Sequence, residues 1–549
     1  MNKILIAAIL GISLICQVSA QTAADSAFLE PKDHILFVGD SITANRTYQS
    51  GVIEALNLVY PQGDLKISTV AAGGADAGSL LKATNEYLSK NSVSIICLMF
   101  GVNDTRWSPD NGEVKVPKFI DAMGEYKKMA DTAGAQLIVL RETHFSHGKN
   151  GVEGLAKLNA MLDRLQNAQT EWAETNLVPI IDVRGAYESA LNKAWQVDPD
   201  YEFSPDVVHP SSPGNAAITI EILRAFGVGL PLAVKGSRGP LNRSHGPIKI
   251  QVEAQYGITG GSSLNLNASL ENQTGKTCSG EVVLVCGPQI FRQSLSVNAG
   301  GKKAIQFPLN LEKMSVTSPI YLAFSDGSIF SSAGSFIYLS PVLNLTDNPF
   351  VAESFLPKED STNCPVNALR VSWEKDALIV DFQWKKEPMV MAGGAFKSRM
   401  GPLVDGPLDL SSPVGQPCDA VEIFLDLRPE ISTGRYTAEA DANPAGIHRL
   451  GLYWSDEKGP TRVEMVGFPE VPSGATVRSK ENDSVEVRLP MKSGENHFGF
   501  SMAVTAAKEF KPGGGKLFRL TANRSLNFEP MSYVRMSPSK SGTFYRIGY

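Results

Sequence analysis

The amino-acid sequence predicts a multidomain protein in which an α/β three-layer sandwich with a parallel sheet is followed by two all-β sandwich domains. Three observations predict this fold class. Residues 33–230 alternate short apolar runs with amphipathic stretches, and residues 232–247 interrupt that alternation with glycine, proline and arginine. Beyond them, the apolar period changes from about 3.6 residues to about two, which is typical of half-buried strands.

The composition is that of an ordinary folded protein. The chain has 549 residues, of which 43% are hydrophobic and 20% charged, and its formal net charge is −6. Nucleic-acid binding is not expected, because phosphate recognition requires clustered lysine and arginine. Past the N-terminus, no apolar run approaches the roughly 20 residues that a membrane-spanning helix needs.

Residues 1–20, MNKILIAAILGISLICQVSA, have the pattern of a secretory signal peptide. Lys3 precedes an apolar run over residues 4–16, and small residues at 18–20 resemble a signal-peptidase site. We therefore expect a secreted or periplasmic protein of bacterial type. The alternative is that the segment is retained as an anchor or a buried helix.

The first predicted domain covers residues 24–231. Apolar runs rich in β-branched residues predict five strands, at 35–38, 67–70, 95–100, 137–140 and 180–183. Amphipathic stretches between them, such as 119–133 and 155–175, predict helices. Strands that alternate with helices indicate βαβ units around a parallel sheet covered on both faces.

The remaining residues are predicted to form a linker and two β-domains. The linker is assigned to 232–247, a small immunoglobulin-like β-sandwich to 248–342, and a larger all-β unit to 345–549. Short runs of alternating apolar residues in both regions, such as 263–270 and 377–384, predict the strands.

Ser41 is the strongest candidate for a reactive residue. It lies in the segment Gly39-Asp40-Ser41, directly after the first predicted strand. Open parallel sheets carry their reactive groups at the carboxyl ends of strands, so a nucleophile is expected at this position. Alternatively, Asp40 and Ser41 form an ordinary helix N-cap.

Asp206 and His209 supply the base that a serine nucleophile needs. They stand three residues apart near the end of the α/β region. A turn of that length lets a carboxylate bind one imidazole nitrogen while the other nitrogen faces the serine. Taken alone, each could instead be an ordinary turn or surface residue.

Four short blocks together resemble the SGNH, or GDSL-type, esterase and lipase family. That family has Gly-Asp-Ser after the first strand, a glycine after the second, Gly-x-Asn-Asp after the third and Asp-x-x-His near the end of the domain. The matching residues here occur in that order: Gly39-Asp40-Ser41, Gly73, Gly101-Val102-Asn103-Asp104 and Asp206-Val207-Val208-His209. The second block departs from the family's commonest form, with Ala71 and Asp76 where asparagine and glycine are frequent.

The resemblance implies a role for each matching residue. Ser41 would be the nucleophile, His209 the general base and then acid, and Asp206 the residue that orients His209. The backbone N–H groups of Ser41 and of Gly73, with Gly74 as the alternative to Gly73, and the side-chain amide of Asn103 would form the oxyanion hole.

Two further residues near the predicted site are candidates for contact with the substrate. Asp40 precedes the nucleophile, and His144 follows the fourth predicted strand. For His144, a loop histidine without a catalytic task is the favoured interpretation. His144 and His147 have no third metal ligand near them in the sequence, so no metal site is predicted.

The last region resembles carbohydrate-binding module family 9. The resemblance rests on Trp373, on the strand at 378–382 and on the segment 419–427. It implies that exposed tryptophans form sugar platforms, and Trp384 and Trp454 are the candidates. The favoured interpretation is that both tryptophans belong to the core, because large aromatic side chains dominate burial.

Together these features predict a secreted serine esterase that forms an acyl-enzyme and hydrolyses an ester, such as an acetyl ester, of a small-molecule or polysaccharide carbohydrate. No metal or organic cofactor is expected. One alternative is an acyltransferase that uses the same triad. Another is a non-catalytic carbohydrate-binding protein built on an SGNH scaffold.

Overall fold

The computed structural model describes the N-terminal and middle regions over residues 26–105, 112–146, 153–199, 201–204, 206–241 and 246–345. Of the C-terminal region it describes residues 349–351, 366–384, 420–427, 447–456, 459–466, 476–480, 484–491, 498–507, 515–520, 534–537 and 542–549. The predicted signal peptide, residues 1–20, lies outside the described residues.

A five-stranded parallel sheet forms the centre of the N-terminal domain, with the order β2-β1-β3-β4-β5. The strands are β1 His34–Gly39, β2 Lys66–Ala71, β3 Ile95–Met99, β4 Gln136–Leu140 and β5 Ile180–Ile181. The order reverses at β1, which has β2 on one side and β3 on the other. In open α/β sheets, ligands bind at the carboxyl ends of the strands at such a reversal.

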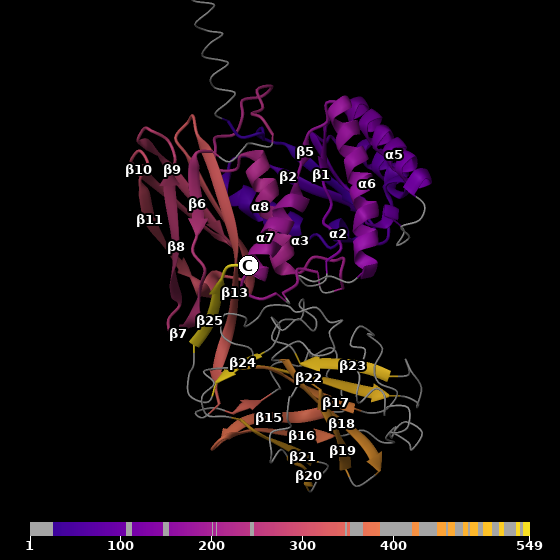
Figure 1. Cartoon of the computed structure of the whole chain (residues 1–549), viewed down its shortest axis with the longest axis vertical. Coiled ribbons are helices and arrows are strands. Elements are labelled where there is room, and N and C mark those ends of the chain that lie inside the picture. The colour runs from indigo at the N-terminus through magenta and orange to yellow at the C-terminus, as the bar shows by residue number, and fades with distance from the viewer. Residues whose placement is uncertain are drawn as a thin grey trace, which may run out of the picture.

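Helices cover both faces of this sheet, and Figure 1 shows them around it. They are α2 Ser41–Ala44, α3 Thr47–Val59, α4 Leu81–Leu88, α5 Gly112–Ala133, α6 Glu153–Thr175, α7 Val183–Trp195 and α8 Ser212–Phe226, with the 3₁₀ turns η1 Ala77–Leu80 and η2 Asn103–Thr105. Alternate residues of each strand point to opposite faces. Thus Ile35 and Phe37 pack with α3, α7 and α8, whereas Leu36 and Val38 pack with α5 and α6.

The middle region is a β-sandwich of two antiparallel sheets. Its strands are β6 Ile248–Val252, β7 Gln255–Thr259, β8 Ser263–Asn272, β9 Cys278–Cys286, β10 Gln289–Val297, β11 Lys302–Asn310, β12 Thr317–Ser325 and β13 Phe330–Asn344, with the turn η4 Leu311–Lys313. The sheet β11-β8-β6 packs on β10-β9-β12-β13. The predicted fold class, a parallel α/β domain followed by antiparallel β-sheets, is confirmed.

The middle sandwich and the N-terminal domain share a hydrophobic core. The outer face of β9 and β12 contributes Val283, Val285 and Tyr321 to the cluster that also contains residues of α8. The Tyr321 hydroxyl donates a 2.8 Å hydrogen bond to the carbonyl oxygen of Val228. Both faces of β9 are consequently buried near its end, which is why its burial does not alternate there.

The described part of the predicted linker packs against the N-terminal domain. The Arg238 guanidinium pairs with the Asp33 carboxylate at 2.5 Å, and the buried Ala233 hydrogen-bonds through its N–H to the Leu29 carbonyl. A segment rich in glycine and proline therefore follows a fixed path here, because its polar groups find partners in the domain that precedes it.

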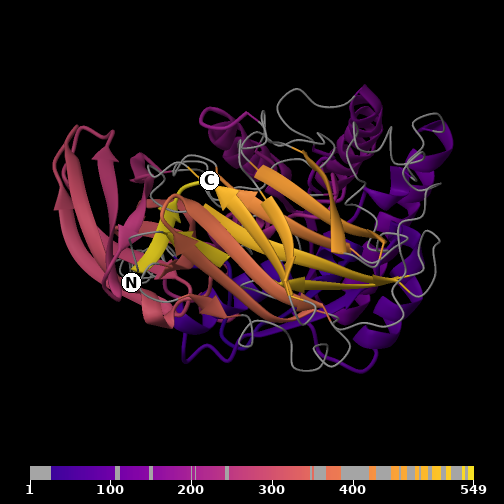
Figure 2. The same ribbon diagram turned by 90° about the horizontal axis from the view of Figure 1, so that it is seen from below.

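The C-terminal region contains a second sandwich, which lies in front in Figure 2. One sheet has the order β14-β15-β16-β21-β20, and the facing strands are β24-β22-β17-β18-β19, with β23 beside β22. The bounds are β14 Phe350–Val351, β15 Val366–Glu374, β16 Ala377–Trp384, β17 Ala420–Asp426, β18 Ile447–Asp456, β19 Gly459–Val466, β20 Thr476–Lys480, β21 Ser484–Pro490, β22 Phe498–Ala507, β23 Gly515–Leu520, β24 Val534–Ser537 and β25 Gly542–Ile547. Apolar side chains of both sheets meet in one core.

One long strand joins the two sandwiches, and the last strand crosses back. β13 pairs with β12 in the middle region and with β24 in the C-terminal region. β25, predicted to belong to the unit 345–549, instead pairs with β13 and β7 of the middle region. The predicted boundary at 342–345 thus divides a continuous sheet, because an alternating pattern identifies a strand without identifying its partners.

Trp384 belongs to the core, the interpretation that the sequence favoured, and is therefore not an exposed sugar platform. Its side chain is 4% exposed and packs in the core of the C-terminal sandwich with Val380 and Phe382. It points inward because it lies an even number of residues from those two core residues on the same strand. Trp454 lies in β18, but its side chain is outside the part of the chain that the structure describes.

Among the described residues, no helix combines the length and the apolar character that crossing a bilayer requires.

Candidate active site

Ser41, His209 and Asp206 form a continuous hydrogen-bonded chain. Ser41 is the first residue of α2, at the carboxyl end of β1. The Ser41 Oγ lies 2.7 Å from Nε2 of His209, and Nδ1 of the same imidazole lies 2.5 Å from Oδ2 of Asp206. This is the nucleophile, base and orienting carboxylate arrangement of serine hydrolases.

The Asp206–His209 turn has a strained backbone. Val207 adopts φ +67°, a left-handed conformation that β-branched residues rarely take. Oδ1 of Asp206 accepts backbone hydrogen bonds from Val208 and His209 at 3.1 and 2.7 Å, and the Ser146 N–H binds the Val207 carbonyl. These contacts hold the turn in the conformation that presents both side chains to Ser41.

Aromatic packing supports the same loop from below. The Phe203 ring packs edge-on against Tyr187 of α7, with 5.1 Å between centroids, and lies 5.5 Å from the ring of Tyr549. The hydroxyl groups of Tyr187 and Ser204 are 2.7 Å apart. Tyr549 follows β25, so residues from the far end of the sequence contact the loop that carries the catalytic pair.

The Asp206–His209 pair is charged when His209 is protonated. Burial opposes ionisation of Asp206, but its hydrogen bonds with His209 outweigh burial and lower the pKa of this carboxyl. The hydrogen bond to Asp206 raises the pKa of His209, against partial burial, and the charges of Asp206 and Asp40 add to the increase. His209 is therefore a stronger base than an isolated imidazole.

The position before Asp40 requires glycine because of close packing. A Cβ on Gly39 would stand 2.3 Å from Thr43 Oγ1 and 2.7 Å from the Met99 carbonyl oxygen. Any side chain here would push β1 away from β3 or displace α2, and Ser41 would move with it.

Asp40 is fully buried, so the prediction that it contacts the substrate is wrong. Its side chain is 0% exposed, and its Oδ1 accepts a 2.9 Å hydrogen bond from the Ile42 N–H as the N-cap of α2. Its Oδ2 accepts from the Asn103 side-chain amide at 3.0 Å. Asp40 thus fixes neighbours of Ser41 from behind.

Asn103 and Gly73, both predicted to contribute donors to the oxyanion hole, lie at the same sheet edge as Ser41. Asn103 begins η2 after β3, and its amide nitrogen donates to Asp40 and to the Ala75 carbonyl, the latter at 3.2 Å. An Asn103 N–H that binds a substrate oxygen must be shared with one of these acceptors. Gly73 lies in the exposed turn after β2, two residues beyond Ala71, which pairs with Gly39.

His144 packs against α7. Its Nδ1 lies 3.3 Å from Oε1 of Glu188, and its ring meets Tyr187 edge-on with 5.6 Å between centroids. Burial lowers the pKa of His144 to about 4, so the imidazole is neutral at physiological pH. With only 12% of its side chain exposed, His144 has the surroundings of a structural residue, in agreement with the favoured interpretation and against its candidacy as a substrate contact.

Glu142 is a polar residue of the site that the sequence analysis did not select. It follows β4 by two residues and is 0% exposed, beside Asp40. A carboxylate directly after a buried strand, at the same edge as Ser41, was the available signal.

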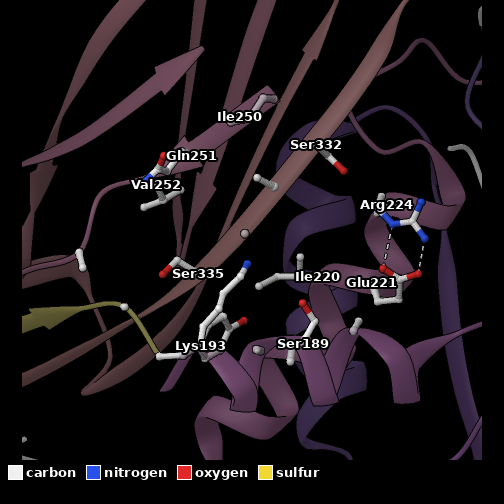
Figure 3. A pocket seen from close by; sticks show the side chains of 18 of the residues that line it. Ser189, Lys193, Ile220, Glu221, Arg224, Ile250, Gln251, Val252, Ser332 and Ser335 are labelled. Carbon is white, nitrogen blue, oxygen red and sulfur yellow. Dashed lines mark hydrogen bonds and ion pairs between the residues drawn. The ribbon is translucent and has the colours of Figure 1, made fainter. Parts of the chain in front are cut away.

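A cleft of about 920 Å³ lies away from the catalytic triad, between α7, α8 and the strands β6 and β13. Figure 3 shows Lys193 and Ser189 of α7 facing Ser335 across it, and the paired Glu221 and Arg224 on α8. Its lining includes none of Ser41, Asp206 and His209, so it is distinct from the candidate active site.

Comparison with known proteins identifies the N-terminal region. Residues 37–217 match the sequence model of the GDSL-like Lipase/Acylhydrolase family. A search among curated proteins finds no match to the chain.

Solved structures resemble part of the chain. They include a variant of an acetyl xylan esterase from Geobacillus stearothermophilus, with 17% identity, TM-score 0.31, and coverage of 38% of this chain and 100% of that one. A gut microbial diltiazem-metabolizing enzyme has 17% identity, TM-score 0.34, and coverage of 50% and 74%. An α/β hydrolase from the metagenome of Lake Arreo, Spain, has 17% identity, TM-score 0.31, and coverage of 37% and 99%.

The family match covers the strands, the nucleophile segment and the Asp-x-x-His turn, which are the parts that the geometry brings together. The N-terminal domain therefore belongs to the GDSL-like lipase/acylhydrolase family, and the protein is an ester hydrolase.

Proposed function

We propose that the N-terminal domain hydrolyses a carboxylic ester through an acyl-enzyme on Ser41. The observation that carries this proposal is the imidazole of His209, which lies 2.7 Å from Ser41 Oγ and 2.5 Å from Asp206 Oδ2. Two hydrogen bonds on opposite ring nitrogens give the base both its orientation and its target.

The reaction has two steps that use the same three side chains. Ser41 Oγ attacks the carbonyl carbon while Nε2 of His209 takes the hydroxyl proton, and His209 then returns that proton to the alkoxy oxygen as its bond to carbon breaks. Water next attacks the acyl carbon and gives a proton to His209, which passes it to Ser41 as the serine leaves. Asp206 stabilises the imidazolium that forms twice.

The charge that develops on the carbonyl oxygen needs donors placed in advance. The amide of Asn103 and the backbone N–H groups of Ser41 and Gly73 are the proposed donors. The Asn103 amide is fixed by Asp40 and Ala75, which supports this assignment, because its orientation is set before the substrate binds.

We further propose a carbohydrate ester as substrate and export as the route to it. The substrate class is supported by the resemblance of the C-terminal region to carbohydrate-binding module family 9, with the β-sandwich there as the sugar-binding part. Export is supported by the signal-like composition of residues 1–20.

The test compares the mature protein with Ser41→Ala on 4-nitrophenyl acetate and on acetylated oligosaccharides. Loss of the nucleophile is expected to lower kcat on the order of 10⁶-fold. Free acetate is measured along with the alcohol product, so that transfer to an added alcohol is distinguished from hydrolysis. Equal rates for the two proteins would contradict the proposal.

A further inference from the structure

Glu142 is enclosed behind the nucleophile by contacts from three elements. Its Oε2 accepts a 2.5 Å hydrogen bond from the Val102 N–H, and its own carbonyl accepts from the Gln166 side chain at 2.6 Å. Gly101 allows this approach: it has φ +150°, and a Cβ there would lie 3.2 Å from Glu142 Oε2 and 2.8 Å from Leu162.

The other carboxyl oxygen of Glu142, Oε1, has no such donor in the part of the chain that the structure describes. Oε1 is buried and receives no hydrogen bond from an N–H or hydroxyl group among the described residues. The unpartnered oxygen lies in the same buried space as the Asp40 carboxyl, with which Glu142 is electrostatically coupled. Two carboxylates only accept hydrogen bonds, so a hydrogen bond between these two groups requires that one of them keeps its proton.

The surroundings determine which carboxyl holds that proton. Burial, followed by the charge of Asp40 and the hydrogen bond to it, raises the pKa of Glu142 well above its usual range. Burial also raises the pKa of Asp40, but hydrogen bonds from Glu142, Ile42 and Asn103 act in the opposite direction. Glu142 is therefore the neutral acid and the donor, and Asp40 is the acceptor.

We propose that Glu142 is a positioning residue for ester hydrolysis: as a neutral acid, it donates a hydrogen bond to Asp40 and so orients the carboxylate that caps the first turn at Ser41 and holds the Asn103 amide. This inference rests on the proposed function of Ser41 and extends it. Glu142 acts through Asp40 and has no contact with the reacting atoms.

The proposal has a consequence for the dependence of activity on pH. Ionisation of Glu142 would remove the donor to Asp40. It would also add a second negative charge on the buried side of Asn103, whose amide is proposed to bind the oxyanion. Activity should therefore fall at alkaline pH as Glu142 loses its proton. On the acid side, activity should rise as His209, whose pKa is raised, loses its proton and becomes a base.

Other titratable groups face the pair and must be distinguished from it. They are Asp104 of η2, whose pKa burial raises to about 7, Tyr48 of α3 and His209; Cys97 of β3 lies beside Tyr48. Burial raises the pKa of both Tyr48 and Cys97 above the range of the assay. Asp104 is thus the main rival for an alkaline decline.

The experiment measures kcat and KM for 4-nitrophenyl acetate across the pH range in four proteins: the wild type, Glu142→Gln, Glu142→Leu and Asp104→Asn. The glutamine amide can donate to Asp40 and accept from Val102 without ionising. We expect Glu142→Leu to lower kcat about 10- to 100-fold, because it leaves buried hydrogen-bonding groups unsatisfied. Glu142→Gln should restore most of that loss and should lack the alkaline decline, which Asp104→Asn should keep.

Thermal melts accompany each assay, so that misfolding of Glu142→Leu is recognised and the pH profile of Glu142→Gln then decides. An alkaline decline that persists unchanged in Glu142→Gln, or that disappears in Asp104→Asn, overturns the proposal. If Ser41→Ala is inactive while the Glu142 variants behave as wild type, only this inference fails. If Ser41→Ala retains wild-type activity, the proposed function fails first.

Discussion

Two pairs of titratable residues flank Ser41, and they differ in exposure and in charge. Asp206 and His209 lie in a partly exposed turn, where the pKa of the carboxyl is lowered and that of the imidazole raised. Asp40 and Glu142 are buried behind the nucleophile, where burial raises the pKa of both carboxyls. The outer pair favours separated charges, and the inner pair retains a proton.

This difference shows how one sheet edge supports two kinds of proton chemistry. Water and backbone N–H groups stabilise the charge on Asp206, so it can balance the imidazolium during turnover. The inner pair has little access to water, so it reduces its charge by keeping a proton and acts through orientation. Substitutions that alter one pair at a time therefore separate the two roles.

Asp206→Asn should have the largest effect in the outer pair. The amide cannot balance an imidazolium and favours the wrong imidazole tautomer, so kcat is expected to fall roughly 10⁴-fold. The matched change in the inner pair is Glu142→Gln, which replaces a neutral donor with another neutral donor and should cost far less. Steady-state kinetics on the same ester measure both, and a larger loss in Glu142→Gln would contradict the comparison.

Asn103→Ala should have an intermediate effect, because this side chain links the inner pair to the oxyanion. Loss of one donor is expected to lower kcat about 10²- to 10³-fold with little change in KM. Asn103→Asp serves as the sharper variant. It places a carboxyl against the Asp40 oxygen that now accepts at 3.0 Å, so its activity should be lower still at neutral pH. An Asn103→Asp enzyme more active than Asn103→Ala would show that the amide does not act as a donor.

The smallest effect concerns folding stability. The pKa of Glu142 is raised in the folded protein, so above its unfolded value of about 4.3 the unfolded chain releases this proton first. Stability should therefore decrease with rising pH, by at most about 1.4 kcal/mol per pH unit from this group. Denaturant unfolding of wild type and Glu142→Gln at several pH values measures the difference. The free energy of unfolding of Glu142→Gln minus that of wild type should increase as pH rises, because only the wild type loses stability from this group. Parallel curves would indicate that Glu142 does not carry the proton.

The sequence predicted the parallel sheet and the residues around Ser41 because both depend on local signals. Apolar runs identify strands, and Ser41, Asn103 and the Asp206–His209 turn lie at strand ends or in a short segment. Glu142 was not selected, because its neutral state depends on how Gly101 and Leu162 enclose it, which are contacts between distant segments.

The β-rich half shows the same limit. Its strands were predicted from alternation, but the pairing of β25 with β7 and the inward direction of Trp384 depend on partners and parity that a local pattern does not state. The strain at Val207 also escaped prediction, because only the folded loop imposes a positive φ on a valine.

The return of β25 to the middle sandwich has a consequence for the order in which the protein matures. As the chain emerges during synthesis, the parallel sheet and all three catalytic side chains are made long before residues 542–549. Yet the ring of Phe203, beneath the catalytic turn, packs against Tyr549. We therefore expect the nascent N-terminal domain to acquire its sheet early and its full activity only after β25 has docked, so that the onset of hydrolysis reports the pairing of β25 with the middle sandwich.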